Sequence, residues 1–173
     1  MHETNDPKIE RFVLRLNLSL FKAISQQAEH SHRSINGEIC AALDSWLFEF
    51  DQLMLVRNRI AQATGKHAAL EIIAAAPNFP TSPNKADYKT MVRLKETQLS
   101  ALKARIERHK AQVGKFTSQN NYVQMVLIWW VTFSFEVREF SKSLTTHALL
   151  GTGAHRTLQP QTPDHALALL RTA

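Results

Sequence analysis

Two short stretches near the amino end carry side chains whose types and spacing could bind an anion. Arg11 and Arg15 fall on one face of an alternating polar and apolar run, which is the pattern of a half-buried strand. Ser34 precedes a run with helical apolar spacing, where its hydroxyl can accept from an amide one turn into the helix. The free amides and positive dipole end of such a helix form an anion site. A plain alternative is that the arginines only line the solvated face of a strand.

No comparable pattern indicates catalysis or metal binding. His30 and His32 lie two residues apart and Cys40 is the single cysteine, so the sequence offers no ligand set with zinc spacing. It also lacks a glycine-rich phosphate loop, a nucleophile elbow and a His-Glu-x-x-His run. We therefore expect no enzyme activity, no cofactor and no metal.

Both stretches lie in a segment, residues 8–50, that predicts a strand, a helix, a brief turn and a second helix. Apolar residues recur at helical spacing first over residues 20–28 and again over residues 35–50. A lone strand has unpaired backbone groups on both edges and is not stable in water. We therefore expect a second copy of the chain to supply an antiparallel partner strand, which makes a dimer.

This segment resembles the ribbon-helix-helix repressors of the Arc, Mnt and MetJ kind, and it is most similar to Arc and Mnt. The resemblance rests on Phe12-Val13-Leu14-Arg15 and on Arg33-Ser34-Ile35-Asn36-Gly37-Glu38-Ile39, which are separated as in Arc. It covers roughly the first third of the chain. Two departures are Ser31-His32, where relatives often carry a glycine, and Ala42, which replaces a basic residue.

The resemblance implies that the paired strands enter the DNA major groove, which is wide enough for a two-stranded ribbon. Arg11, Val13 and Arg15 would then contact bases, because arginine can bond bidentately to guanine and valine can touch a thymine methyl group.

The resemblance also assigns roles around the start of the second helix. The backbone at Ser34, Ile35 and Asn36 would bind a DNA phosphate beside the groove. Arg33 and Glu38 would form a structural ion pair.

The composition is consistent with an intracellular nucleic-acid-binding protein. The net charge of +6 and the pI near 9.7 favour an acidic partner. The first 49 residues contribute none of this excess, since they hold five Lys or Arg against seven acids. The amino end lacks an apolar signal segment and the single cysteine fits a reducing compartment, so we expect a cytoplasmic, nucleoid-associated protein.

The rest of the chain predicts helices around one break. Residues 77–84 hold three prolines and read as a linker. Before it, residues 51–76 predict a helical extension. After it, residues 85–150 predict a helical, partly coiled-coil region for oligomerisation or partner binding. That region would consist of one long basic helix over 85–116 and an apolar helix over 122–137. Residues 1–7 would be a flexible arm and residues 151–173 a tail with a short helix.

The apolar stretch 122–137 has three candidate roles. It could be buried between helices of an oligomer, bind a protein partner, or associate with a membrane. Its length, together with Gln124 and Glu136, disfavours a membrane span.

The expected fold class is mainly α, with an amino-terminal ribbon-helix-helix followed by a helical, partly coiled-coil region. The expected function is sequence-specific transcriptional repression, by binding double-stranded DNA as a homodimer or as a tetramer of two dimers. The alternative is an antitoxin, or a conjugation or partition accessory protein, in which residues 117–150 bind a protein partner.

Overall fold

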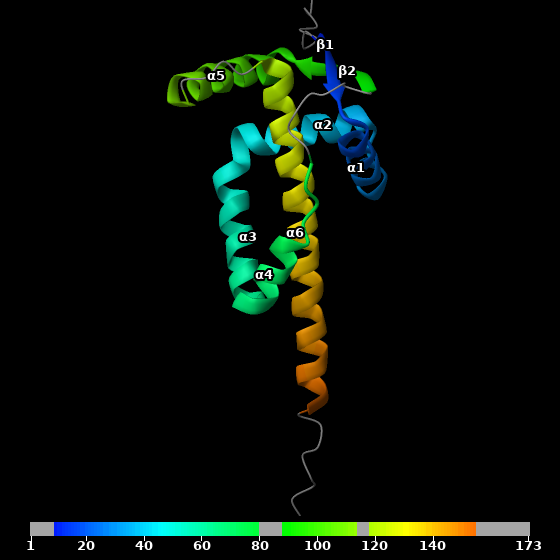
Figure 1. Ribbon diagram of the computed structural model, residues 1–173, viewed down its shortest axis with the longest axis vertical. Coiled ribbons are helices and arrows are strands. Elements are labelled where there is room, and N and C mark those ends of the chain that lie inside the picture. Colours follow the sequence, from blue (N-terminus) through cyan, green and yellow to red (C-terminus); the bar gives the residue numbers. More distant parts are fainter. Residues whose placement is uncertain (1–8, 80–87, 114–117, 155–173) are drawn as a thin grey trace, which may run out of the picture.

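The computed structural model describes residues 9–79, 88–113 and 118–154. It is mainly helical, with a two-stranded ribbon at one end and a long helix through the middle (Figure 1). Along the chain the elements are β1 Ile9–Leu16, α1 Leu18–His30, α2 Ile35–Asp44, the π-helical turn η1 Ser45–Glu49, α3 Phe50–Thr64, α4 Lys66–Ala74, β2 Tyr88–Lys95, α5 Glu96–Val113 and α6 Gln119–Ala154.

The expected amino-terminal unit is present as β1, α1 and α2. Both helices begin at a polar cap: the side chain of Asn17 accepts from the amide of Leu20 at 2.7 Å, and Ser34 Oγ accepts from the amide of Gly37 at 3.0 Å. The expected fold class, a mainly α chain with an amino-terminal ribbon-helix-helix followed by a helical region, is confirmed.

The partner of β1 differs from the expectation. β1 pairs antiparallel with β2 of the same chain, and Val13 lies opposite Met91. The expected pairing with a second copy of the chain is therefore wrong, because the chain satisfies this edge of β1 itself. A homodimer or tetramer is no longer needed to complete the ribbon.

The expectation of one long helix over 85–116 is wrong for its first part, which is β2. Inward and outward residues alternate along this strand. Val92 and Leu94 are 0% and 1% exposed, whereas Met91 and Arg93, which directly precede them, are exposed. Only from Glu96 does the chain become helical, as α5.

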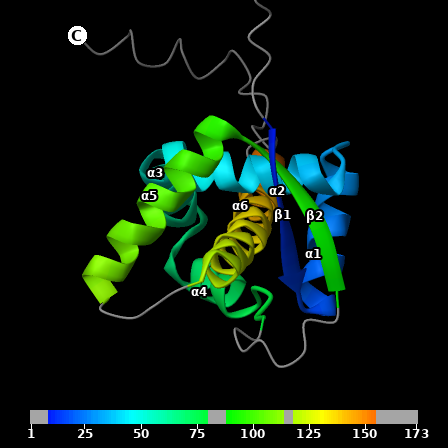
Figure 2. The same cartoon turned by 90° about the horizontal axis from the view of Figure 1, so that it is seen from above.

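One hydrophobic core lies beneath the ribbon and contains residues from both halves of the chain. Both strands contribute their inward side chains, and helices α1, α2, α5 and α6 contribute most of the other members. The view from above shows these helices close to the ribbon (Figure 2). The fully buried or nearly buried members are Leu14, Leu16, Leu20, Ile24, Ile39, Leu43, Val92, Leu94, Leu102, Val123 and Leu127.

Helix α6 runs through the middle of the molecule and packs against elements of the first half (Figures 1 and 2). Its apolar segment is buried by the chain's own helices, as Tyr122, Val126 and Leu127 show with exposures of 2% or less. Burial inside one chain thus replaces the expected burial between the helices of an oligomer. The helix also continues to Ala154, past residue 150, where the predicted helical region ends.

Helices α3 and α4 occupy the predicted helical extension. Gly65 joins them with a φ of 93°, a conformation that favours glycine. An ion pair ties α3 to α6: Arg57 Nε donates to Glu136 Oε2 at 2.8 Å, and both side chains are largely buried. Among the described helices, none combines the length and apolarity needed to cross a membrane. The predicted arm 1–7 and the predicted short helix of the tail lie outside the described residues.

Candidate nucleic-acid interface

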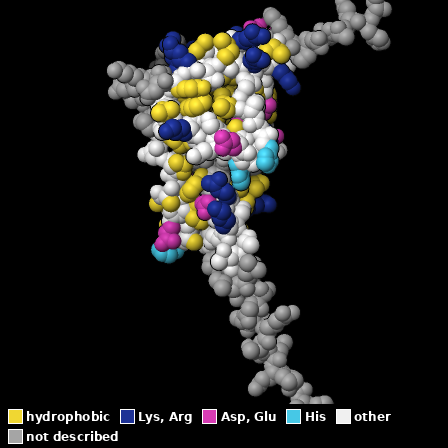
Figure 3. Space-filling view, turned by 90° about the vertical axis from the view of Figure 1, so that its right-hand side faces the viewer, with side chains coloured by type: hydrophobic (Ala, Val, Ile, Leu, Met, Phe, Trp, Pro, Cys, Tyr) yellow, Lys and Arg dark blue, Asp and Glu magenta, His cyan; other side chains and the backbone are white. Residues whose placement is uncertain are grey.

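The outer face of the ribbon is a row of exposed cations around an apolar centre. From β1 it presents Arg11, Val13 and Arg15, the three residues predicted to contact bases. From β2 it presents Lys89, Met91 and Arg93, with Lys95 at the end. The central residues Val13 and Met91 are 48% and 51% exposed. Figure 3 shows Lys and Arg side chains gathered at the end of the molecule where the ribbon lies.

The pairing register brings like charges together. Arg11 lies opposite Arg93, and Arg15 lies opposite Lys89. Like charges directly opposite on one face of a sheet destabilise it. None of the outward positions of β1 or β2 carries an acid. This row of like charges therefore lowers the stability of the protein when no partner is bound. An anionic partner bound along the ribbon would offset that loss.

Two asparagines hold the backbone from which these arginines project. Asn120 of α6 accepts from the Arg15 amide at 2.7 Å and donates to the Arg15 carbonyl at 3.2 Å. Asn36 of α2 accepts from the Arg93 amide at 2.8 Å and donates to the Arg93 carbonyl at 3.4 Å. These bonds occupy the outer edge of each strand, so Arg15 and Arg93 are presented from rigid backbone.

A second side chain supports each of these backbone positions. Gln124 Nε2 donates to the carbonyl of Arg15 at 2.9 Å, and Cys40 Sγ donates to the carbonyl of Arg93 at 3.4 Å. Burial, helped by the nearby negative charge of Asp44, raises the pKa of the Cys40 thiol. The thiol therefore keeps its proton and can remain a donor at neutral pH.

The start of α2 lies against the edge of β2 through Asn36. The Ser34 cap uses the amide of Gly37, whereas the amides at the first positions of a helix have no acceptor within it. The side chain of Asn36 is hydrogen-bonded to the backbone of Arg93. At Ile35 and Asn36, the groups that could bind an anion are therefore the backbone amides. The phosphate role of the backbone at Ser34, Ile35 and Asn36 stays a prediction.

The structure pairs Arg33 with Glu38, as the resemblance implied. Arg33 Nη1 lies 3.3 Å from Glu38 Oε2, and the Glu38 side chain is fully buried. The indole of Trp130 donates to the other oxygen, Glu38 Oε1, at 2.7 Å. Trp130 therefore supplies a donor to this carboxylate, where the basic residue found in relatives is replaced by Ala42.

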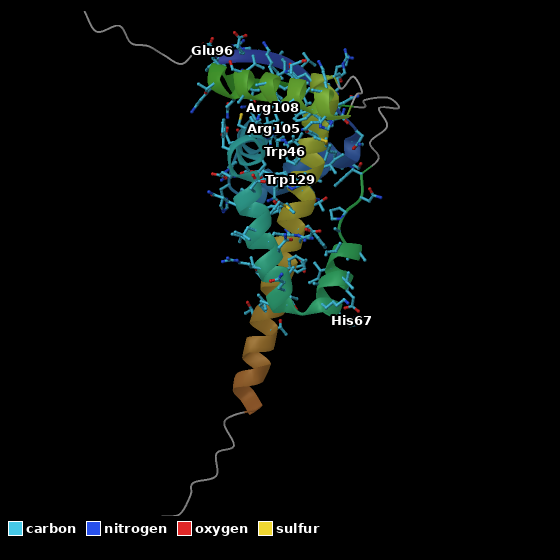
Figure 4. The ribbon with its side chains drawn as sticks, turned by 90° about the vertical axis from the view of Figure 1, so that its left-hand side faces the viewer. Trp46, His67, Glu96, Arg105, Arg108 and Trp129 are labelled. Atoms are coloured by element: carbon cyan, nitrogen blue, oxygen red, sulfur yellow. The ribbon has the colours of Figure 1, made fainter. Side chains whose placement is uncertain are left out.

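Part of the basic helix α5 faces the rest of the protein. Arg105 and Arg108 lie on the side of α5 that faces Trp46 (Figure 4). With Trp46, they line a small pocket whose other residues include His109 and Tyr122. In the described ranges, no group of three or more His, Cys, Asp and Glu side chains could hold a metal ion.

The β2 half of the outer face, namely Lys89, Met91 and Arg93, was not predicted from the sequence. The signal was available, because residues 88–95 alternate polar with apolar as β1 does. It was masked by helical apolar spacing that continues through α5 and includes Val92.

Comparison with protein families supports the amino-terminal unit alone. Residues 6–48 match the family model of the Arc-like DNA binding domain. Neither a curated protein nor a solved structure matches the chain.

Proposed function

We propose that this chain, whose residues 6–48 match the Arc-like DNA-binding domain, is a sequence-specific transcriptional repressor that inserts its β1–β2 ribbon into the DNA major groove. The observation that carries the proposal is the outer face of the ribbon: exposed cations surround an apolar pair on two strands of one chain. A two-stranded ribbon fits the major groove, and repression follows from occupying the operator.

The arginines and the apolar pair of the outer face have roles that suit their chemistry. Arg11, Arg15 and Arg93 each carry a planar fork that can bond to O6 and N7 of guanine. Val13 and Met91 form the apolar centre and contact thymine methyl groups.

The start of α2 supplies the contact that positions the ribbon in the groove. The amides of Ile35 and Asn36, beside the Ser34 cap, bind a backbone phosphate. In this proposal the protein acts by binding DNA in the nucleoid, without catalysis.

The test compares DNA binding by the wild type and by Arg15→Ala on a selected duplex and on random duplexes. Loss of a base-reading arginine should cost about 1–3 kcal/mol on the selected site and little on random DNA. Arg59→Ala is the matched control, because it removes the same charge from the exposed surface of α3, away from the ribbon (Figure 1). Specific binding that survives Arg15→Ala unchanged would refute the proposed role of the ribbon.

A second candidate function is binding a protein partner, as in an antitoxin or an accessory protein. It is favoured by exposed apolar side chains on and beside α3 and α4: Phe48, Leu55 and Leu70 are 64%, 53% and 56% exposed. This surface differs from residues 117–150, where the start of α6 is largely buried. A partner that co-purifies with Arg15→Ala but is lost from a Phe48→Ser/Leu55→Ser variant would support this function.

A further inference from the structure

The second half of the chain matches the first half position by position over a strand and the helix that follows it. Residues 11–28 of β1 and α1 correspond, without a gap, to residues 89–106 of β2 and α5. Outward and inward residues coincide along both strands. The buried positions also coincide: Leu14 with Val92, Leu16 with Leu94, Ile24 with Leu102, and Ala28 with Ile106.

The strand register is the one that a two-fold axis requires. Val13 lies opposite Met91, which is its own counterpart in the repeat. Arg11 then lies opposite Arg93, and Arg15 opposite Lys89, so each pair maps onto the other when the two halves are exchanged. The axis passes through the centre of the ribbon, between Val13 and Met91.

The second helix of each half also corresponds, residues 34–46 with residues 118–130. Ser118 caps α6 by accepting from the amide of Asn121 at 3.2 Å, as Ser34 caps α2. Asn36 binds the backbone of Arg93, and its counterpart Asn120 binds the backbone of Arg15, the counterpart of Arg93. Both bonds join one half to the other, so the halves hold each other's strands.

A second crossed pair lies deeper in the molecule. Trp130 Nε1 donates to Glu38 at 2.7 Å, and its counterpart Trp46 donates from Nε1 to Tyr122 Oη at 3.0 Å. Tyr122 is the counterpart of Glu38, so the two contacts share one geometry and differ only in the acceptor.

One pair of residues departs from the symmetry. It favours pairing between the two halves of one chain over pairing of the first half with a second copy of itself. Gln98 Nε2 donates to Asp44 Oδ1 at 2.8 Å, whereas the counterparts of these residues are both apolar: Leu20 belongs to the core and Ile128 packs against it. If the first half paired with a second copy of itself in the same geometry, Asp44 would face Leu20. Its carboxylate would lose the amide donor and meet an apolar side chain, which is costly.

We infer that residues 88–113 and 118–130 form a second ribbon-helix-helix unit, and that the two units together build, within one chain, a complete DNA-binding domain that reads an asymmetric DNA site. This inference rests on the proposed function, because it specifies the DNA that the ribbon recognises. Arg15 and Arg93 are equivalent in the repeat, and each can read a guanine. Arg11 corresponds to Lys89, which binds as a point charge without the bidentate fork. The two arms of the site therefore differ at the base pairs that face Arg11 and Lys89.

The internal pairing can be tested without DNA by disulfide formation in a Cys40→Ala background. Directly opposite residues on paired strands lie within the Cα separation that a disulfide spans. Val13→Cys/Met91→Cys should close a disulfide inside one chain, seen as the loss of both free thiols together with the mass of a single chain on a non-reducing gel. Val13→Cys alone is the control, because Val13 would face itself across the axis of a homodimeric ribbon. Rapid linkage of that single variant into dimers would overturn the inference.

The DNA prediction uses a site selected from random duplexes by the wild type, with two symmetrised versions that duplicate either arm. We expect one chain per site and binding to the selected duplex about tenfold tighter than to either palindrome. Lys89→Arg should recover about tenfold on the palindrome that duplicates the arm read by Arg11.

Two other outcomes have separate meanings. Two chains bound to a palindromic site with equal or higher affinity would overturn this inference and leave the proposed function standing. The absence of sequence preference on every duplex would overturn the proposed function and the inference with it.

Discussion

Among the described residues, His32 is the only non-glycine residue with a positive φ, at 53°. It lies in the turn between α1 and α2, where relatives often carry a glycine. A non-glycine residue in this left-handed region destabilises the folded state by about 1–2 kcal/mol. Glycine removes this strain, but it also gives the unfolded chain more conformational freedom, which offsets part of the gain. His32→Gly should therefore raise the free energy of unfolding by about 0.5–1 kcal/mol.

The control for His32 is two residues away. His30 lies in the last turn of α1, so His30→Gly should lower the free energy of unfolding by about 0.5–1 kcal/mol. Urea unfolding of both variants measures the contrast. Equal destabilisation by the two substitutions would mean that the turn gains nothing from glycine.

The two crossed tryptophan contacts allow a matched comparison of a charged and a neutral acceptor. Trp130→Phe leaves one oxygen of the fully buried Glu38 carboxylate without its donor, and should cost about 2–3 kcal/mol. Trp46→Phe removes the equivalent bond to the Tyr122 hydroxyl and should cost about 1 kcal/mol. Thermal unfolding of both variants tests the order, and equal costs would mean that ring packing, not the acceptor, sets the loss of stability.

At the scale of elements, β1, α1 and α2 could be predicted because strand alternation, two helical apolar runs and a serine cap all agree there. β2 was not predicted, although residues 88–95 alternate like a strand, because Val92 also fits the helical spacing of α5. Leu94 resolves the ambiguity, since it is buried two residues from Val92 and would point away from it on a helix. The partner of β1 lies far along the chain, and local patterns carry no information about such a contact.

Alanine substitutions along β2 measure this alternation. Val92→Ala and Leu94→Ala each remove buried atoms and should cost about 2 kcal/mol or more. Met91→Ala lies between them on the exposed face and should change stability by less than about 0.5 kcal/mol. Equal costs at residues 91 and 92, measured by urea unfolding, would contradict a strand with one buried face.

At the scale of the whole molecule, the candidate site could be predicted only in part. Arg11, Val13 and Arg15 follow from the alternation of one strand together with the family resemblance. Their neighbours in the row, Lys89 and Arg93, come from a strand more than seventy residues later. The chain brings the two strands together because they share one core, in which Leu14 and Leu43 pack with Val92 and Leu127.

A shared core predicts how the protein unfolds. Neither unit has a core of its own, so both should unfold in one transition, reported alike by tryptophan fluorescence and by far-ultraviolet circular dichroism. Because the ribbon is completed within one chain, the midpoint should not change over a hundredfold range of protein concentration. A homodimeric ribbon would instead raise the midpoint with concentration, since association stabilises the folded state by mass action. The concentration series therefore decides whether one chain or two make the ribbon, before any DNA is added.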